Sequence, residues 1–130
     1  MKRQVRLGDL QLAIMQVLWE RGKATVGEVQ EALQAKRPLA YTTVATMLTK
    51  MEAKGYVKRE VKAKAHLFRP VLRKESVRRW MVTDLAKRLF GGDVTEMVAH
   101  LLNGTNIDAD ELARLKKLIH EKEKETRNGN

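Results

Sequence analysis

The sequence has no cysteine, two prolines, and only two residues each of tryptophan, tyrosine and phenylalanine among its 130 residues. The absence of cysteine excludes a disulfide framework, a thiolate metal site and a cysteine nucleophile, and it fits a reducing compartment. No apolar run approaches the roughly 20 residues that a membrane-spanning helix needs. The basic start MKRQVRLGDLQLAIM also lacks the apolar stretch of a secretory signal. We therefore expect a cytoplasmic protein that does not insert into a membrane.

Residues typical of catalysis or cofactor binding are also scarce. The one serine, Ser76, lies in a charged segment where helix capping or solvent exposure explains it, and no histidine lies at a spacing that suggests nucleophilic catalysis. No glycine-rich phosphate loop is present. His66, His100 and His120 are far apart, but a zinc or nickel site assembled by dimerisation from His100 or His120 and nearby acids stays an open alternative. The sequence thus predicts neither an enzyme nor a cofactor.

Positive charge is abundant and unevenly distributed. The chain has 26 lysines and arginines against 16 acidic residues, a formal charge of +10. Residues 1–80 carry 18 of these basic residues against 7 acidic ones, a net +11, whereas residues 81–130 carry 8 against 9, a net −1. A basic excess confined to one part of a chain favours a polyanionic partner for that part.

Two helices are predicted in the first 38 residues. The first begins near Asp9, has apolar residues at helical spacing, and is closed by Gly22, which can adopt the left-handed conformation. Thr25 and Glu28 form a T-x-x-E capping box, which satisfies orphan amide groups at the start of the second helix. Pro38 marks the end of that helix, since the residue before a proline disfavours helical geometry.

A third helix is predicted from Ala40 or Tyr41 to Gly55. Its apolar face consists of Val44, Met47, Leu48 and Met51. At about 100° per residue, the opposite face consists of Thr42, Thr46, Thr49 and Lys50. The threonines are therefore expected to point away from the core.

Strand-like alternation replaces the helical period after Gly55. Val57, Arg59 and Val61 would share one side of a strand, and the basic or acidic residues between them would share the other. A turn at residues 62–65 precedes a second strand at residues 66–71. Three helices followed by a basic hairpin describe a winged helix-turn-helix domain, which we place at residues 1–72.

Three further helices are predicted, and they carry apolar stripes. Their bounds are Lys74–Phe90, Val94–Leu102 and Ala109–Lys122. We expect residues 73–124 to form a three-helix dimerisation region and residues 125–130 a disordered tail, which makes the fold mainly α (α+β). An intrachain core would take some of the apolar residues, and a two-fold partner would cover the rest. The candidate interface residues are Trp80, Leu85, Leu89, Val94, Met97, Val98, Leu101, Leu112, Leu115 and Ile119.

The polar face of the third helix predicts contact with DNA. In a helix-turn-helix domain the second helix of the motif lies in the major groove, and a threonine there offers a hydroxyl to a phosphate or base and a methyl to thymine. The wing would follow the backbone or enter a narrow A·T minor groove. The candidate DNA-binding residues are Tyr41, Thr42, Thr43, Thr46 and Lys50 on the helix and Lys62, Lys64, His66 and Arg69 on the hairpin.

Other interpretations of the same residues stay open. Any single threonine can be a tolerated surface residue, a charge run is usually a solvated face, and Tyr41 could pack under the turn as well as bind a phosphate. No arginine lies on the helix face, although arginine to guanine is the commonest strong base contact. The alternatives are a nonspecific architectural DNA binder and a winged-helix module for protein interaction or RNA association.

Residues about 5–122 resemble the penicillinase-repressor family (BlaI/MecI/CopY type) of bacterial transcriptional regulators. The resemblance rests on LGDLQLAIMQVLWERGKATVGEVQEAL, LAYTTVATMLTKMEAKGYVKRE and AHLFRPVL, in this order and spacing. It implies a homodimeric repressor that binds a palindromic operator with TACA/TGTA-like half-sites. Repressors of this family are often encoded beside a membrane-bound metalloprotease sensor, so the resemblance also implies such a neighbouring gene.

The resemblance extends to individual positions. Tyr41, Thr42, Thr43 and Thr46 match the recognition-helix contacts of the family, whereas Ala45 replaces a longer polar side chain of some members. Induction in the family involves cleavage in the C-terminal helices, commonly between asparagine and phenylalanine, where this chain has His100-Leu101. The copper-responsive branch uses cysteine pairs, and this chain has none.

Overall fold

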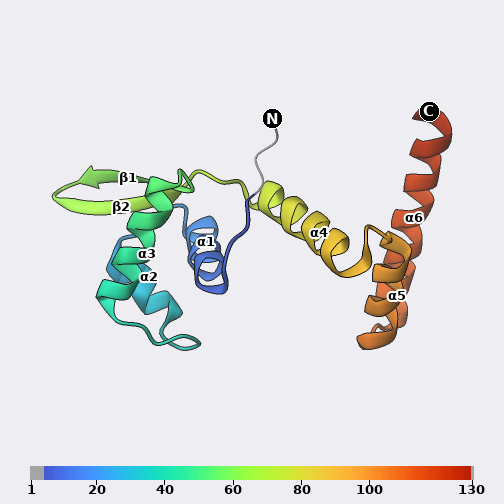
Figure 1. Cartoon of the computed structure of the whole chain (residues 1–130), viewed down its shortest axis with the longest axis horizontal. Coiled ribbons are helices and arrows are strands. Elements are labelled where there is room, and N and C mark those ends of the chain that lie inside the picture. The colour runs from blue at the N-terminus through green and yellow to red at the C-terminus, as the bar shows by residue number, and fades with distance from the viewer. Residues whose placement is uncertain (1–4, 130) are drawn as a thin grey trace. The chain divides into compact units, whose positions relative to one another are not determined.

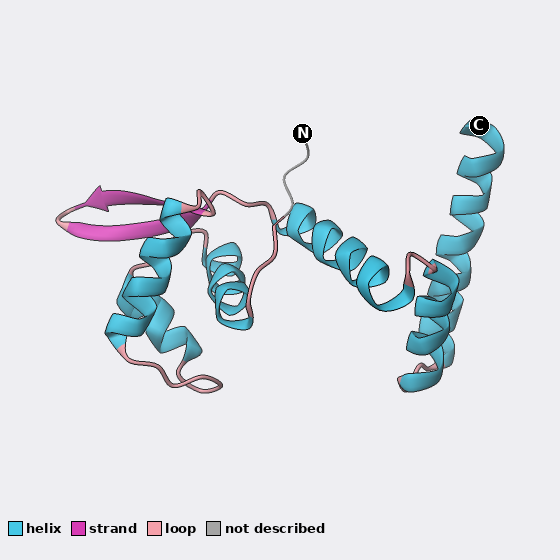
Figure 2. Cartoon of the chain, in the orientation of Figure 1, coloured by secondary structure: helices cyan, strands magenta, loops and turns pink. Residues whose placement is uncertain are grey.

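The computed structural model describes residues 5–129 and divides into two compact units, one ending at Asp84 and the other beginning at Leu85. The described part is mainly helical with one two-stranded antiparallel sheet, which confirms the predicted fold class (Figures 1 and 2). The elements in chain order are α1 (Asp9–Arg21), α2 (Val26–Leu33), α3 (Tyr41–Ala53), β1 (Val57–Lys62), β2 (Ala65–Pro70), α4 (Lys74–Phe90), α5 (Val94–Gly104) and α6 (Ala109–Gly129).

Helix α1 ends and helix α2 begins as their capping signals predict. Gly22, at φ 86°, closes α1 and donates its N–H to the Leu18 carbonyl at 2.7 Å. The hydroxyl of Thr25 accepts the Glu28 N–H at 3.1 Å, and the Glu28 carboxylate accepts the Thr25 N–H at 2.8 Å. This reciprocal pair also lowers the pKa of the Glu28 carboxyl, because the backbone hydrogen bond stabilises its charged form.

Helix α2 ends earlier than predicted, at Leu33 instead of near Pro38. The Leu33 carbonyl accepts the N–H groups of Lys36 at 3.2 Å and Arg37 at 2.7 Å, so the chain turns tightly before the proline. Residue 37 cannot continue a helix comfortably because it precedes a proline, and the turn absorbs that restriction upstream.

The hairpin pairs β1 with β2 from Val57 opposite Pro70 to Lys62 opposite Ala65. Its turn lies within the predicted tip, and β2 begins one residue earlier than predicted and ends one residue earlier. Phe68 also exchanges two backbone hydrogen bonds with Ala24, at 2.8 and 3.0 Å. The hairpin is therefore tied by backbone to the link between α1 and α2.

The core of the N-terminal unit extends into α4. Phe68, Ile14, Leu48 and their neighbours are almost completely buried, and the same cluster includes Leu72 and Val77, with Trp80 and Met81 packed against it. The N-terminal compact unit therefore includes the first part of α4 and ends at Asp84, whereas the sequence predicts a division after residue 72. The periodicity of the sequence predicts the bounds of α4, but it does not indicate in which core the apolar side chains of this helix pack.

The C-terminal unit has capped helices and little buried surface. The side chain of Asp93 caps α5 and that of Asp108 caps α6. Helix α6 continues beyond Lys122, so the predicted disordered tail is helical up to Gly129, and Asn130 lies outside the described residues. Within this extension the Lys122 ammonium lies 4.0 Å from the Glu125 carboxylate, and the hydroxyl of Thr126 donates to the Lys122 carbonyl at 2.9 Å. Of the described residues in this unit, Ala86 alone is buried.

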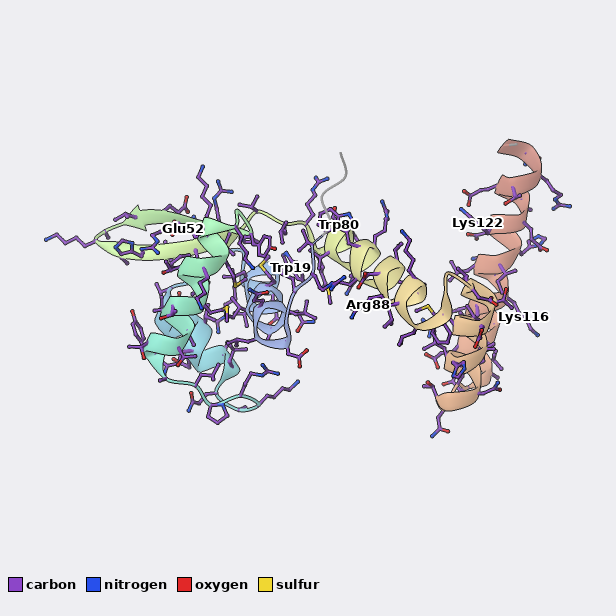
Figure 3. All side chains as sticks on the ribbon, in the orientation of Figure 1. Trp19, Glu52, Trp80, Arg88, Lys116 and Lys122 are labelled. Carbon is purple, nitrogen blue, oxygen red and sulfur yellow. The ribbon has the colours of Figure 1, made fainter. Side chains whose placement is uncertain are left out.

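Trp19 connects α1 to the segment that leaves the hairpin. Its indole N–H donates to the Leu72 carbonyl at 2.8 Å in a half-buried position (Figure 3). We expect Trp19→Phe to lower the free energy of unfolding by about 1–3 kcal/mol, because the carbonyl loses its donor away from water. Urea denaturation measures this change.

The matched control is Trp80→Phe. The Trp80 indole packs against the same core, and within residues 5–129 no hydrogen bond from it is seen. This control should cost only the lost apolar area. Equal losses in the two variants would mean that the Trp19 hydrogen bond contributes nothing to stability.

Candidate nucleic-acid interface

The outer face of α3 is polar, and its side chains do not belong to the core. Thr42, Thr43, Thr46 and Lys50 are exposed, whereas Val44, Leu48 and Met51 on the opposite side are completely buried. Because a helix is rigid, burial of one side fixes the direction of the other. The structure thus presents these three threonines and Lys50 to solvent together, and Thr49, the fourth threonine of the helix, is exposed as well.

Tyr41 occupies the first position of α3 and is 54% exposed. Ala40 caps the helix without a side-chain hydrogen bond, so the first turn depends on backbone contacts. This exposure favours the expectation that the phenol is available to a phosphate over the expectation that it packs under the turn.

Thr49 has a different role from the other threonines. Its hydroxyl donates to the Ala45 carbonyl at 3.0 Å and accepts a hydrogen bond from the Arg59 guanidinium at 3.3 Å. Arg59 also forms an ion pair with Glu52 at 3.0 Å. The last turns of α3 therefore face the hairpin, and Thr49 is engaged there.

The basic residues of the hairpin are divided between its two faces. Residues opposite each other in an antiparallel pair share a face, so His66 lies with Val61 on the face that carries Arg59 and Phe68. Lys62 and Arg69 lie on the other face, and Lys64 lies in the turn. All four are exposed, but the hairpin does not gather them into one patch.

Arg69 has a structural partner on its own face. Its guanidinium lies 3.8 Å from the Glu60 carboxylate, which also accepts a hydrogen bond from the Lys23 ammonium at 3.2 Å. That hydrogen bond lowers the pKa of the Glu60 carboxyl, with smaller contributions from neighbouring positive charges. Glu60 is thus ionised at neutral pH, and the Lys23 contact ties the hairpin to the α1–α2 link.

The hairpin tip is conformationally strained. Ala63 has φ 50° and Lys64 has φ 66°, and they are the two non-glycine residues with positive φ among residues 5–129. Such turns favour asparagine and glycine, since a Cβ atom disfavours the left-handed region by about 1–2 kcal/mol. A lysine at this place gives up stability and gains an exposed positive charge at the end of the hairpin.

The predicted interface residues of the C-terminal region differ in their surroundings. Trp80 packs partly buried against the N-terminal core, and Met97 and Leu115 are half-buried within the C-terminal unit. The exposed members are Leu85, Leu89, Val94, Val98, Leu101, Leu112 and Ile119. So many exposed aliphatic side chains on α5, α6 and the end of α4 leave apolar stripes uncovered in a single chain.

The histidines form no multidentate site in the part of the chain that the structure describes. The ring of His100 lies tilted against that of Phe90, with 5.2 Å between centroids, and His120 lies 3.9 Å from Glu123. Within residues 5–129 no group of three metal-ligating side chains converges, and no helix there is long and apolar enough to cross a membrane.

The sequence profile described as "Penicillinase repressor" matches residues 7–121, which is nearly the whole chain. The protein belongs to the penicillinase-repressor family. The transcriptional regulator BlaI of Mycobacterium tuberculosis is 38% identical over 125 residues, covering 95% of this chain and 89% of that protein. The penicillinase repressor of Bacillus licheniformis is 21% identical and covers 93% of this chain and 94% of its own length. This family consists of transcriptional repressors.

Solved structures support the winged-helix fold of this penicillinase-repressor family member. The B. licheniformis BlaI monomer in complex with the blaP half-operator aligns with a TM-score of 0.50, at 23% identity, over 58% of this chain and 92% of that one. A MarR family protein from Bacillus stearothermophilus aligns with a TM-score of 0.53, at 20% identity, over 95% of this chain and 77% of that one. Both alignments concern the fold alone.

The sequence did not predict that Arg59 of β1 and Glu52 of α3 form an ion pair between the hairpin and the helix. The signal was present, because Arg59 is the one charged residue between Val57 and Val61 on the inward side of a strand. A charge on the inward side of an alternating pattern indicates a partner on the neighbouring element.

The strained tip generates a test of the wing. Lys64→Gly should raise the free energy of unfolding by about 0.5–1 kcal/mol by relieving the left-handed strain, yet it should weaken DNA binding. Ala63→Gly should give a similar gain in stability with unchanged DNA affinity. Urea denaturation and fluorescence anisotropy with duplex DNA measure the two effects. If the two glycine variants bind DNA equally well, Lys64 makes no contact.

Proposed function

We propose that the protein is a sequence-specific DNA-binding transcriptional repressor that acts in the cytoplasm as a homodimer on a palindromic operator. The observation that carries the proposal is the polar outer face of α3, which is exposed beside a basic hairpin. Occupation of the operator would block the promoter. Membership of the penicillinase-repressor family supports the same assignment.

Base recognition would come from Thr42, Thr43 and Thr46. Their hydroxyls can bond phosphates or base edges, and their methyls can contact thymine, so A·T-leaning half-sites are expected. The resemblance to the family suggests TACA/TGTA-like sequences. The BlaI structure from B. licheniformis with its half-operator supports duplex DNA as the class of ligand.

Phosphate binding would come from Lys50 on α3 and from the hairpin, chiefly Lys62 and Lys64. Each neutralised phosphate releases counterions, and this release makes binding steeply dependent on salt. His66 lies on the α3 side of the hairpin and would approach the same groove.

Dimerisation would bury the apolar stripes of the C-terminal region. Leu101 of α5 and Leu112 and Ile119 of α6 are exposed, and a two-fold partner offers the same residues in return. Two half-sites about one helical turn apart would then bind two α3 helices at once.

Relief of repression would act on the same helices. In the family pattern the chain is cleaved in this region, and His100-Leu101 at the matching position is exposed within α5. Cleavage there would need local opening of the helix, since a protease binds extended backbone. A membrane-bound metalloprotease sensor or another protease is the proposed partner.

The threonine face is tested by a triple substitution. Binding of the full chain to its own upstream DNA and to shuffled DNA of equal composition is titrated against salt. Wild type should prefer the upstream fragment by about a thousandfold or more. Thr42→Ala, Thr43→Ala and Thr46→Ala together should abolish most of this preference and leave nonspecific binding intact, since the basic residues remain.

Equal and salt-sensitive binding of wild type to both fragments would instead favour the architectural DNA binder. Binding to neither fragment would favour the protein-interaction or RNA-associated module. Retention of the preference by the triple variant would remove these threonines from base recognition.

The dimer is tested by Leu115→Asp, with Ala113→Asp as its control. Both substitutions add one negative charge to α6, but residue 113 lies on the side opposite the apolar stripe. Leu115→Asp should yield monomers in sedimentation velocity and weaken operator binding by about a hundredfold or more, because the linked second contact is lost. Ala113→Asp should stay dimeric. A dimeric Leu115→Asp variant would contradict the proposed interface.

A further inference from the structure

Four side chains form a junction between α3 and the hairpin, which we call the Arg59 clamp: Thr49, Glu52, Arg59 and Phe68. The Arg59 guanidinium lies 3.0 Å from the Glu52 carboxylate and donates to the Thr49 hydroxyl at 3.3 Å. The same guanidinium stacks over the ring of Phe68, its cross-strand partner, at 4.8 Å. Figure 3 labels Glu52 on α3, where this helix passes the hairpin.

The clamp uses properties that belong to arginine alone. A guanidinium is planar, so it can stack on an aromatic ring while its edge bonds two oxygens, whereas a lysine ammonium is a compact charge. Phe68 is almost completely buried, and the ring and the two oxygens hold Arg59 on three sides. Arg59 is therefore one of the contacts that set the orientation of β1 relative to α3, and among the hydrogen bonds and ion pairs of the described residues it joins the polar side chains of α3 to β1.

Stability alone is a poor explanation of the clamp. Arg59 Nε is buried, and among the described residues it has no hydrogen-bond partner. The Arg59 and Glu52 side chains are 30% and 36% exposed, so solvent weakens their attraction. An apolar side chain of similar volume often stabilises such a place as well as an ion pair does. A definite geometry is what the ion pair adds.

A second ion pair holds the opposite face of the hairpin. Glu60 follows Arg59 in β1, and it points the other way and contacts Lys23 at 3.2 Å. Lys62 and Lys64 lie beyond both contacts, toward the tip. At about 3.3 Å per residue, Lys62 is roughly 10 Å past Arg59, so a tilt of about 10° at the clamp displaces it by about 2 Å. A displacement of this size is enough to break a contact between the lysine ammonium and a phosphate.

We infer that Arg59 is a positioning residue that sets the angle of the hairpin relative to α3 and so determines whether Lys62 and Lys64 reach DNA phosphates. The inference rests on the proposed function, in which α3 and the hairpin bind one duplex. It assigns Glu52 a role opposite to the one its charge suggests. An acidic side chain near DNA repels the phosphates, but here its loss would weaken binding because the hairpin loses its orientation.

The experiment compares Glu52→Leu with Glu31→Leu in the full chain. Both variants lose one negative charge, and Glu31 is an exposed residue of α2 outside the clamp. Binding to the upstream fragment is measured over a range of salt concentrations. Glu52→Leu should lower the slope of log K against log salt by about one to two units, while Glu31→Leu should leave it unchanged. Unchanged or tighter binding by Glu52→Leu would overturn the inference.

A double-substitution cycle separates positioning from a general loss of stability. In wild type, Lys62→Ala with Lys64→Ala should lower the salt slope. In an Arg59→Met background the same pair should lower it no further, because the lysines no longer reach phosphates. A merely structural Arg59 would leave the lysine effect intact. Arg59→Lys should fail to restore the slope, because lysine keeps the charge without the planar group that lies over the Phe68 ring.

A measurement without DNA distinguishes failure of this inference from failure of the proposed function. Backbone ¹⁵N relaxation of Glu52→Leu should show increased mobility at residues 60–66, with α1 and α2 unchanged. Rigid hairpin amides in that variant would overturn the clamp whatever the DNA data show. Absence of DNA binding by wild type would overturn the proposed function and the binding role of the clamp together.

Discussion

The burial of one side of α3 is the constraint on which the rest of the N-terminal unit depends. Val44, Leu48 and Met51 are completely enclosed by the core. A rigid helix with one buried side has no freedom to rotate, so the directions of Thr42 and Thr46 follow from core residues that touch no ligand. In the proposed function, recognition and stability would thus use different side chains of one helix, and the exposed face can vary without cost to the core.

The hairpin depends on the same core for its order. A two-stranded hairpin is marginally stable by itself, and this one also has a strained turn at Ala63 and Lys64. Backbone hydrogen bonds between Phe68 and Ala24 and ion pairs on both faces hold it against the helices. The strain at the tip and the polar contacts at the base are consistent with a segment in which the placement of charge matters more than maximal stability.

Most helices and strands could be predicted from the sequence, because capping and periodicity depend only on residues that are close together in the chain. The Thr25–Glu28 box and the bounds of α4 could be predicted since capping and helical period are properties of adjacent residues. The boundary between the two units could not be predicted, because Val77 has the same helical spacing whichever core it packs in. Thr49 shares the exposed face of α3 by angle alone, and only the three-dimensional position of Arg59 distinguishes it from the threonines that remain free.

The chemistry of the α3 face gives a physical reason in favour of the proposed homodimer. Threonine contacts discriminate modestly between bases, and no arginine on this face supplies a bidentate guanine contact. One half-site would therefore be weakly selected against the many competing sites of a genome. Two linked half-sites would multiply this discrimination. Dimerisation through the exposed aliphatic stripes of α5 and α6 would therefore compensate for the modest base discrimination of the threonine face.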